Sequence, residues 1–400
     1  MENYQTTLVM PLESLFLCWM ETNFQGRSLN PSPICIHSHY WTCQTTNFLA
    51  TLPDFSSFNF LEITDLSSNE FSGEISTSFS QETKILSLGK NKFSGNLSRN
   101  LTNMSKLEYL GINENNITGE LPYFICQIST LQILNLQKKS LQGSIPDCIS
   151  NLTRLHILDL SSNHLVGKIP AKLGNLVGMI ETPNIFSYSY TINGFNTEIH
   201  DLIVNWKRVE QGLSWKNLEI YALLDLSMNQ ISNEIPTSLG SLKALKLLNV
   251  SHNKLYGRVP ASLGDLKNLE GFDLSYNNLL ASIPKTFTKL EQLSVLDVSN
   301  NNLTGKIPVG RQMDTMNSPN LFANNSLCRM QIKVPCPEVL PVPPTKPPQL
   351  EIKVLWFSWQ GVWIGCLVGV FVTVGNLYLI GYFVPTLPPN RRQQKRRSRF

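Results

Sequence analysis

The residue types that most often carry out chemistry are sparse in this 400-residue chain. Cys35, His37, His39 and Cys43 could together be drawn as a zinc site, but their spacing fits no common zinc motif. No two of the eight cysteines form a Cys-x-x-Cys pair. We find no Gly-x-Ser-x-Gly elbow, P-loop, kinase motif or His-Glu-x-x-His signature. We therefore expect no catalytic residue, no metal site and no cofactor.

Asparagines offer a different chemistry, because Asn-x-Ser/Thr sequons accept N-linked glycans in secreted proteins. The candidate glycosylation sites are Asn96, Asn100, Asn103, Asn116, Asn151, Asn249, Asn302 and Asn324. Their density favours an exported chain. The net charge of +4 is mild and gives no reason to expect a nucleic-acid partner.

A repeated frame positions most of these residues. Residues 155–170, 245–260 and 293–308 follow Leu-x-x-Leu-x-Leu-x-x-Asn-x-Leu-x-Gly-x-Ile-Pro with conservative exchanges. Its asparagine recurs, mostly every 24 residues, at Asn69, Asn91, Asn115, Asn163, Asn229, Asn253, Asn277 and Asn301, and Lys139 takes this place once. One unit alone cannot bury its leucines, so the pattern predicts stacked strand-and-return units. The asparagine can satisfy backbone groups at the turn, whereas Lys139 cannot accept a hydrogen bond and predicts a weak point.

An insert interrupts the repeats. Asn163 and Asn229 are 66 residues apart instead of 24, and the extra residues run roughly from 177 to 217. Disordered segments are poor in aromatic residues, so we expect this insert to be folded. Its aromatic residues are Phe186, Tyr188, Tyr190, Phe195, Trp206 and Trp215.

The Leu-x-Gly-x-Ile-Pro half of the frame resembles the plant extracellular subclass of leucine-rich repeats, over roughly residues 52–308. Plant receptor-like proteins, which lack a kinase, carry an island just before their last four repeats, and four anchors follow the insert here. Trp206, Lys207 and Glu210 resemble the motif that ends this island, with Arg208 in place of its glycine. The resemblance implies an α/β repeat solenoid: a curved right-handed superhelix with a concave parallel sheet.

The closing segment, 309–337, resembles the C-terminal cap of that family. The matching residues are Gly310, Gln312, Thr315, Asn324 and Leu327, and Cys328 and Cys336 are spaced as its disulfide pair. Cys126 and Cys148 follow consecutive Leu-Pro and Ile-Pro turns. Stacked turns lie close together, so these two could pair, and the sequence leaves bonded and free thiols both open.

A Pro-rich spacer at 338–353 leads to an uncharged stretch in which we place a transmembrane helix at 361–384. Six basic residues in the tail at 385–400 should stay in the cytoplasm, which puts the repeats outside. Gly361, Gly365 and Gly369 are four residues apart and predict a flat face for a partner helix. The resemblance implies that this partner is a receptor-like kinase or co-receptor.

The domain order follows from these segments. Residues 1–45 lack a clear secretory signal, so we expect an irregular segment there. Repeats occupy 46–176 and, after the insert at 177–217, 218–308. The weak N-terminus fits a truncated or natively short member of the family.

We expect ligand contacts at the junction of insert and repeats, at Met228, His252, Tyr276, Trp206 and Lys207. The hypothesis is a single-pass type I receptor of the plasma membrane. It would bind an extracellular peptide or protein and signal through a kinase partner, in defence or development. One alternative is an enzyme-inhibitor-type repeat protein, which would lack both insert and span. The other is a truncated, non-signalling relic or decoy.

Overall fold

The computed structural model describes residues 35–37, 40–42, 52, 60–75, 79–181, 203–206, 209–213, 220–316, 318–329, 334–336 and 359–381. The chain divides into two units, Met1–Cys336 and Pro337–Phe400, which are described separately.

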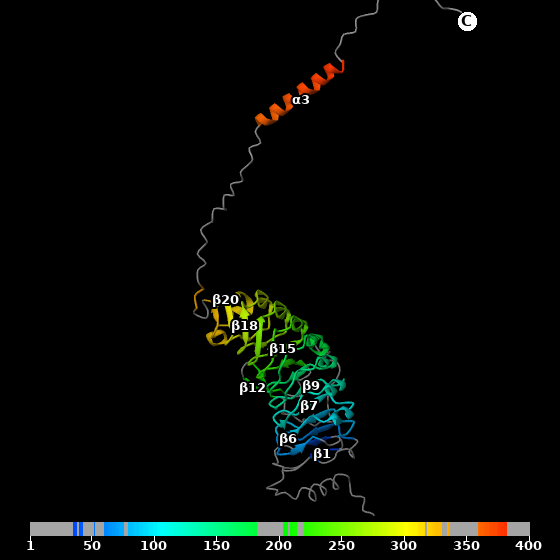
Figure 1. The fold of residues 1–400 in the computed structure, drawn as a ribbon. Coiled ribbons are helices and arrows are strands. Elements are labelled where there is room, and N and C mark those ends of the chain that lie inside the picture. Colours follow the sequence, from blue (N-terminus) through cyan, green and yellow to red (C-terminus); the bar gives the residue numbers. More distant parts are fainter. Residues whose placement is uncertain are drawn as a thin grey trace, which may run out of the picture. The chain divides into compact units, whose positions relative to one another are not determined.

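The first unit is a curved stack of repeats (Figure 1). Successive repeats each add one short strand to an 11-stranded sheet, which is parallel except for the first pair. Its strands, in spatial order, are β1 (Cys35–His37), β2 (Tyr40–Thr42), β3 (Ile63–Asp65), β5 (Ile85–Ser87), β7 (Tyr109–Gly111), β9 (Ile133–Asn135), β10 (Ile157–Asp159), β13 (Ala222–Asp225), β15 (Leu245–Asn249), β17 (Gly271–Asp273) and β19 (Val295–Asp297). This is the leucine-rich-repeat solenoid that the sequence predicts.

The return half of the repeats forms two smaller parallel sheets. One contains β4 (Ser72–Glu74), β6 (Lys92–Gly95) and β8 (Asn116–Ile117). The other contains β14 (Ser232–Asn233), β16 (Lys254–Arg258), β18 (Asn278–Ala281), β20 (Asn302–Lys306) and β21 (Ser326–Cys328).

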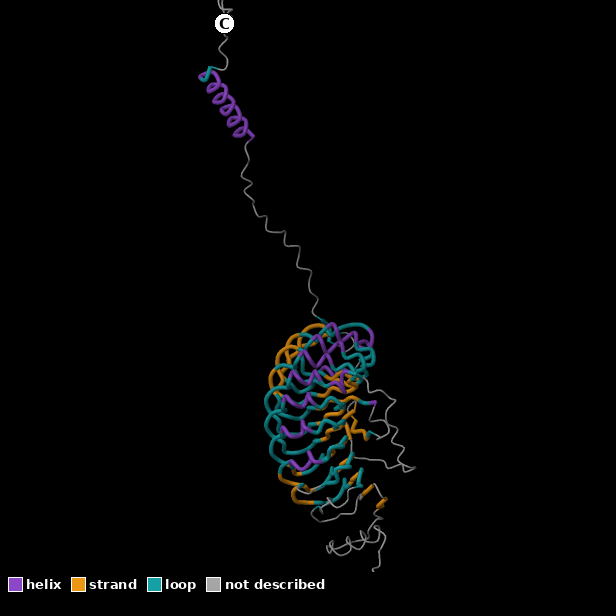
Figure 2. Tube along the Cα trace, turned by 90° about the vertical axis from the view of Figure 1, so that its right-hand side faces the viewer, coloured by secondary structure: helices purple, strands orange, loops and turns teal. Residues whose placement is uncertain are grey.

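Short 3-10 helices follow these strands and stack one above another along the solenoid (Figure 2). They are η1 (Arg99–Asn103), η2 (Tyr123–Gln127), η3 (Asp147–Asn151), η4 (Ala171–Asn175), η6 (Thr237–Ser241), η7 (Ala261–Asp265), η8 (Lys285–Lys289), η9 (Arg311–Asp314) and η10 (Pro319–Phe322). Neighbouring turns come very close. A Cβ on Gly240 would lie 2.4 Å from the carbonyl oxygen of Ser262 in the next repeat, so glycine is required there.

The leucines of the frame fill the space between these layers as one continuous core. Leu110, Leu134 and Leu158, at the same position in successive repeats, are fully buried. Each such side chain contributes roughly 1.5–3 kcal/mol by leaving water. Stacking therefore supplies the stability that a single repeat lacks.

The repeat asparagines form a hydrogen-bond ladder. The Nδ2 of Asn163 donates to Leu160 O (2.9 Å) and Ser161 O (3.1 Å) in its own repeat and to Leu136 O (3.0 Å) in the preceding one. Its Oδ1 accepts the N–H of Leu141 at 3.2 Å. Asn325 makes the equivalent bonds, accepting from Leu303 N–H at 2.9 Å and donating to Val298 O at 2.9 Å. The closing cap thus contains one more ladder position than we identified from the sequence.

The solenoid continues past the expected start of the insert at 177. Helix α2 (Val177–Ile180) places Met179 in the core, and Met179 O accepts the N–H of Ala244 at 2.9 Å. Within the insert, β11 (Ile203–Trp206) and β12 (Val209–Gly212) form an antiparallel pair. Strand β13 then pairs directly with β10, so the insert leaves the sheet without a gap.

Arg329 holds the C-terminal cap together. It is 2% exposed, its Nη1 donates to Met313 O at 2.7 Å, and its guanidinium pairs with Asp314. Asp314 also accepts the N–H of Gly310 at 2.9 Å. A disulfide bond joins Cys328 to Cys336.

The second unit contains one described helix, α3 (Trp359–Leu379). Its segment Gly361–Leu379 has a mean hydropathy of 1.9 and is long and apolar enough to cross a membrane. The helix ends before our expected limit of residue 384. Gly381 takes a left-handed conformation, with φ of 80°, and its N–H donates to Tyr378 O at 3.1 Å, which closes the last turn.

Candidate functional site

A column of exposed and half-buried residues with left-handed backbone runs along the first unit, immediately before each ladder position. We call it the ridge. Its members have φ between 51° and 57° although none is glycine, and they are Ser68, Lys90, Glu114, Lys138, Ser162, Met228, His252, Tyr276, Asn300 and Asn324. This conformation costs most side chains roughly 1–2 kcal/mol, so the fold has to impose it.

Hydrogen bonds between repeats impose this conformation. The N–H groups of Met228, His252 and Tyr276 each donate to a serine carbonyl of the next repeat, at 3.0, 2.9 and 3.0 Å. The acceptors are Ser251, Ser275 and Ser299. The ridge is therefore a rigid line of side chains spaced one repeat apart.

The three ridge residues that we expected to contact a ligand lie in consecutive repeats. The rings of His252 and Tyr276 stack, with centroids 4.0 Å apart and an interplanar angle of 13°. Met228 is 56% exposed and Tyr276 is 50% exposed. The hydroxyl of Ser162 donates to the Met228 sulfur at 3.4 Å. Together they form a sulfur and aromatic surface, whereas Lys138 and Glu114 form an ion pair farther along the ridge.

The concave strand positions are buried. A second hydrophobic cluster fills them, formed by Ile63, Ile85, Tyr109, Ile133, Ile157, Leu223 and Leu247 together with Leu213 of the insert. Leu213 is the one described member of this cluster that lies outside the repeat frame. The strand positions around Ile157 and Leu223 are therefore closed, and the ridge is the open surface beside them.

Two carboxylates are buried next to this cluster. Asp159 Oδ1 accepts the N–H of Ser161 at 2.9 Å, and Asp225 Oδ1 accepts that of Ser227 at 2.9 Å. Burial, and then the charge of Asp225, raises the pKa of Asp159 to about 7. Burial raises the pKa of Asp225 to about 6. We did not single out this pair from the sequence, although Asp at the same frame position in adjacent repeats would have indicated it.

His156 lies beside the same pair of strands. Its Nδ1 is 2.9 Å from Tyr221 O, and a carbonyl can only accept, so Nδ1 carries the proton. Burial lowers the pKa of His156 below 6.5. The imidazole is therefore a neutral donor that ties the start of β13 to β10.

The insert residues are placed only in part. Trp206 ends β11 and is opposite Val209 in the register of the pair. The side chain of Trp206 and the whole of Lys207 lie outside the described residues. Their expected contact with a ligand stays a prediction.

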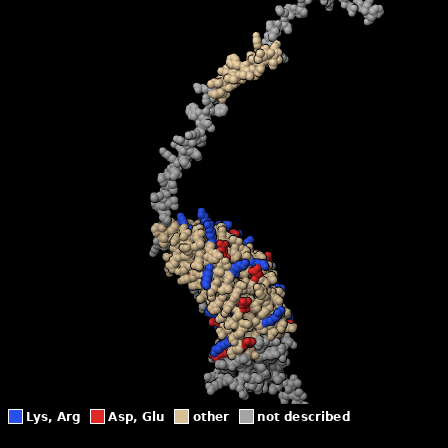
Figure 3. Space-filling model, viewed as in Figure 1, with Lys and Arg blue, Asp and Glu red and all other residues tan. Residues whose placement is uncertain are grey.

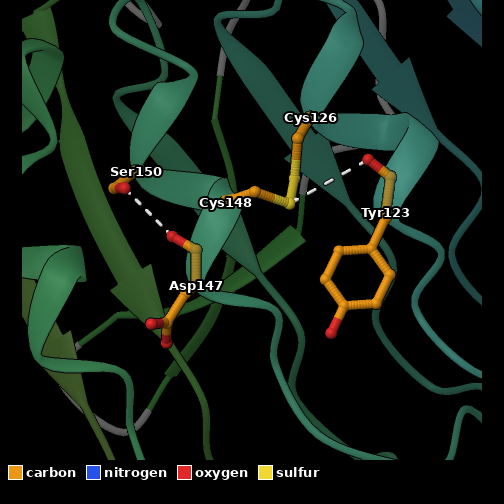
Figure 4. The surroundings of a disulfide bond; sticks show 5 residues. All are labelled: Tyr123, Cys126, Asp147, Cys148 and Ser150. Atoms are coloured by element: carbon orange, nitrogen blue, oxygen red, sulfur yellow. Dashed lines mark hydrogen bonds between the residues drawn. A yellow bond between two sulfur atoms is a disulfide. The ribbon is translucent and has the colours of Figure 1, made fainter.

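A disulfide bond links Cys126 of η2 to Cys148 of η3, in adjacent repeats (Figure 4). The carbonyl oxygen of Tyr123 lies 3.9 Å from the Cys148 sulfur, which is a contact because a disulfide sulfur has no proton to donate. The Tyr123 side chain is 72% exposed. The bond joins two turns of the 3-10 helix stack.

The sequons fall into two groups. Asn96, Asn103, Asn116, Asn151, Asn302 and Asn324 are exposed, and Asn100 is half-buried. Asn249, in contrast, is 3% exposed and its Nδ2 donates to Asp225 Oδ2 at 3.0 Å. The expectation of a glycan at Asn249 is therefore corrected, because the folded chain has no room for one there.

On helix α3, a Cβ added at Gly365 or Gly369 would meet no atom within 4 Å. No charged residue lies in α3, whereas acidic and basic side chains are interspersed on the visible face of the repeats (Figure 3). Among the described residues, no group of three His, Cys, Asp or Glu side chains could hold a metal ion.

Comparisons with known proteins agree with this architecture. The leucine-rich-repeat family profiles match residues 106–128, 154–176, 223–242, 244–266 and 259–303. Receptor-like protein 46 of Arabidopsis thaliana is 61% identical over 181 residues. That match covers 44% of this chain and 22% of the relative, so the chain matches under a quarter of that protein's length.

Solved structures share the fold. The plant peptide hormone receptor RGFR1, in complex with RGF2, is 26% identical with a TM-score of 0.53, over 70% of this chain and 38% of that one. The Arabidopsis receptor kinase HAESA ectodomain, in complex with an extended IDA peptide hormone, is 25% identical with a TM-score of 0.54, over 72% of this chain and 42% of that one. A plant ice-binding protein, 22% identical with a TM-score of 0.56, covers 75% of this chain and 83% of its own and shows the fold alone.

Proposed function

Because the chain belongs to the plant leucine-rich-repeat receptor-like proteins, we propose that it is a cell-surface receptor without a kinase of its own. Its repeats bind an extracellular peptide at the ridge, and its membrane helix recruits a receptor-like kinase or co-receptor. The repeats lie outside the plasma membrane and the basic tail lies in the cytoplasm. This signalling serves defence or development.

The observation that carries the proposal is the exposed stack of His252 and Tyr276 beside Met228. Large exposed side chains in left-handed backbone are held against their local preference, which is a reason to look for function there. Asn300 and Asn324 occupy the same ridge position in the following repeats, and asparagine adopts this conformation readily. Tyrosine and methionine are also enriched where proteins bind partners.

A peptide is the ligand class that the comparisons favour. The two receptor ectodomains at 25% identity or more both hold peptide hormones. A line of rigid side chains spaced one repeat apart suits an extended chain, which offers alternate side chains at regular intervals.

The binding test replaces the ridge surface without disturbing the fold. The variant Met228→Asn, His252→Asn and Tyr276→Asn uses the residue that Asn300 and Asn324 already show to fit this backbone. Full-length chain in detergent is incubated with a synthetic library of secreted plant peptides, and bound peptides are identified by mass spectrometry. We expect wild type and a Tyr123→Ser control to retain the same peptides and the ridge variant to lose them. Retention of those peptides by the ridge variant would exclude the ridge as the site.

The partner test addresses helix α3. Gly365→Leu with Gly369→Leu fills the flat face, whereas Val374→Leu alters the opposite side of the helix. We expect the glycine variant to lose co-precipitation with a tagged receptor-like kinase expressed in the same plant cells, and the valine variant to keep it. Equal recovery in both would remove this face from the proposal.

Topology is tested by a glycosidase mobility shift on membrane fractions of the chain tagged at Phe400. A large shift places the exposed sequons in the secretory lumen. An unshifted chain would favour a non-signalling relic.

A further inference from the structure

The contact between β10 and β13 differs from the other contacts of the main sheet between β3 and β19. These two strands are hydrogen-bonded neighbours, yet the insert lies between them in the chain. We call this contact the seam. Asp159 and Asp225 are register partners across it, and they are 2% and 5% exposed. Like charges directly opposite each other on neighbouring strands are destabilising.

The next strand, β15, offers an amide at this sheet position. On β15 the partner of Asp225 is Asn249, whose Nδ2 donates to Asp225 Oδ2 at 3.0 Å. On the far side of the seam, β9 presents Asn135 as the partner of Asp159. At the seam two carboxylates face each other between these amides, and both are buried. Asp273 and Asp297 are also register partners, on β17 and β19, but Asp273 is only half-buried. Two ionised carboxylates only accept hydrogen bonds, so a direct bond between them needs a proton on one of them.

Neighbouring charges do not remove this conflict. The charge of Lys138 stabilises the ionised form of Asp159, but the Lys138 ammonium is also 3.6 Å from the Glu114 carboxylate. The charge of Asp273 on β17, two strands from Asp225, raises the pKa of Asp225 further. His156 faces Tyr221 O and is neutral, because burial lowers its pKa. The described cation that acts on Asp159 is therefore shared with another carboxylate.

We propose that Asp159 and Asp225 form a proton-sharing joint in the seam: it is tight while one proton lies between the two carboxylates and loosens when both are ionised. Because burial raises the pKa of Asp159 to about 7 and that of Asp225 to about 6, the proton leaves near neutral pH. The joint therefore senses the pH of the medium around the repeats.

The joint also reaches the ridge. Ser162 N–H donates across the seam to Ser227 O at 2.9 Å, and its hydroxyl donates to the sulfur of Met228. Loosening the seam would therefore release the positions of Ser162 and Met228, and ligand binding would weaken as pH rises. This last step rests on the proposed function, whereas the joint itself does not.

Hydrogen exchange measured by mass spectrometry on the full-length chain in detergent tests the joint without any ligand. The seam amides Leu160 and Ser162 donate to Asp225 O and Ser227 O, both at 2.9 Å. Leu136 and Lys138 make the equivalent bonds one repeat earlier, at 2.9 and 3.0 Å, and are an internal control. Between about pH 5.5 and about pH 8, after correction for the chemical exchange rate, we expect the seam amides to lose about tenfold more protection than the control amides.

Two variants assign the effect to the carboxylate pair. Asp159→Asn can donate to Asp225 as Asn249 does, and Asp159→Ser copies Ser87, which holds this frame position in an earlier repeat. Both should abolish the difference between seam and control amides. Asp65→Asn is the matched control, because Asp65 bonds Ser67 in the same way but has Ser87, not a carboxylate, as its neighbour.

An equal change at seam and control amides, or a wild-type response in both Asp159 variants, would overturn the joint. A confirmed joint with no peptide bound at the ridge would instead leave the joint standing and remove the proposed function.

Discussion

The imidazole of His252 stacks on the phenol ring of Tyr276 at a centroid distance of 4.0 Å, although the two residues lie in different repeats. Their N–H groups are fixed by equivalent hydrogen bonds, to Ser275 O and Ser299 O. The two side chains therefore leave the backbone in the same direction, one repeat apart. The fold thus presents an aromatic surface that needs little reorganisation before a ligand binds.

Replacing a ridge side chain should separate stability from binding. Met228→Asn exchanges a residue strained at φ of 54° for one that tolerates this backbone. We expect the free energy of unfolding to rise by about 1 kcal/mol, measured by chemical denaturation, while peptide retention falls. Asn300→Met should show the reverse change in stability. A loss of stability in Met228→Asn would mean that the Met228 packing outweighs its backbone strain.

The effect of a substitution at Gly111 on stability should depend on whether residue 109 is tyrosine. A Cβ added at Gly111 would lie 2.6 Å from the Tyr109 hydroxyl oxygen, and Tyr109 is fully buried. Gly111→Ala alone should destabilise the chain by about 1–3 kcal/mol. In a Tyr109→Ile background the same change should be nearly neutral, because Ile85 and Ile133 hold this strand position in the adjacent repeats. Equal costs in both backgrounds, measured by thermal unfolding, would show that the clash with Tyr109 is not the cause.

Lys139 should mark a weak rung of the ladder. Asn115 and Asn163 each accept one backbone N–H through Oδ1, and a lysine has no acceptor. Lys139→Asn should therefore raise the free energy of unfolding, by about 1 kcal/mol for one added hydrogen bond. Asn163→Lys should lower it. If Lys139→Asn were destabilising instead, the lysine would have contacts of its own that matter more than the ladder.

The repeat predicted most of this fold because its signal is periodic. Leu110, Leu134 and Leu158 share one frame position, so a single rule places them all in the core. Asn325 was missed although it lies 24 residues after Asn301, because the cap was interpreted from its cysteines rather than from the period. Only the unusual residue types of Met228, His252 and Tyr276 mark them in the sequence, and nothing in the sequence indicates their left-handed backbone.

The buried cluster on the concave face includes one described residue from outside the repeat, Leu213. Whether Ile157 and Leu223 are exposed depends on what packs on them, and the described packing partner from the insert is Leu213. The repeat pattern cannot predict this contact, because Leu213 lies outside the repeats. The Asp159–Asp225 pair was missed for a related reason: the two become neighbours only if the sheet resumes in register after the insert.

The free energy of unfolding should fall as pH rises, because the folded chain raises the pKa values of two carboxyl groups. The pKa of Asp159 rises from 3.8 to about 7 and that of Asp225 from 3.8 to about 6. At pH values between the unfolded and the folded pKa of each carboxyl group, the folded chain binds more protons at that group than the unfolded chain does. Their contribution to the free energy of unfolding is therefore complete below about pH 4 and is lost as pH rises through about 6 and about 7.

His156 acts in the opposite sense, because burial lowers its pKa from 6.5, so its contribution is complete at high pH and is lost as pH falls below 6.5. Above about pH 6.5 the contribution of the two carboxyl groups is therefore separated from that of His156. Thermal unfolding between about pH 6.5 and about pH 8 measures it. Wild type and Asp65→Asn should lose stability over this range. Asp159→Ser should be nearly flat, because the remaining Asp225, whose pKa burial raises to about 6, has lost most of its proton below this range. A wild-type chain that gains stability over this range would show that the pair is ionised throughout, with its charge compensated in the folded chain.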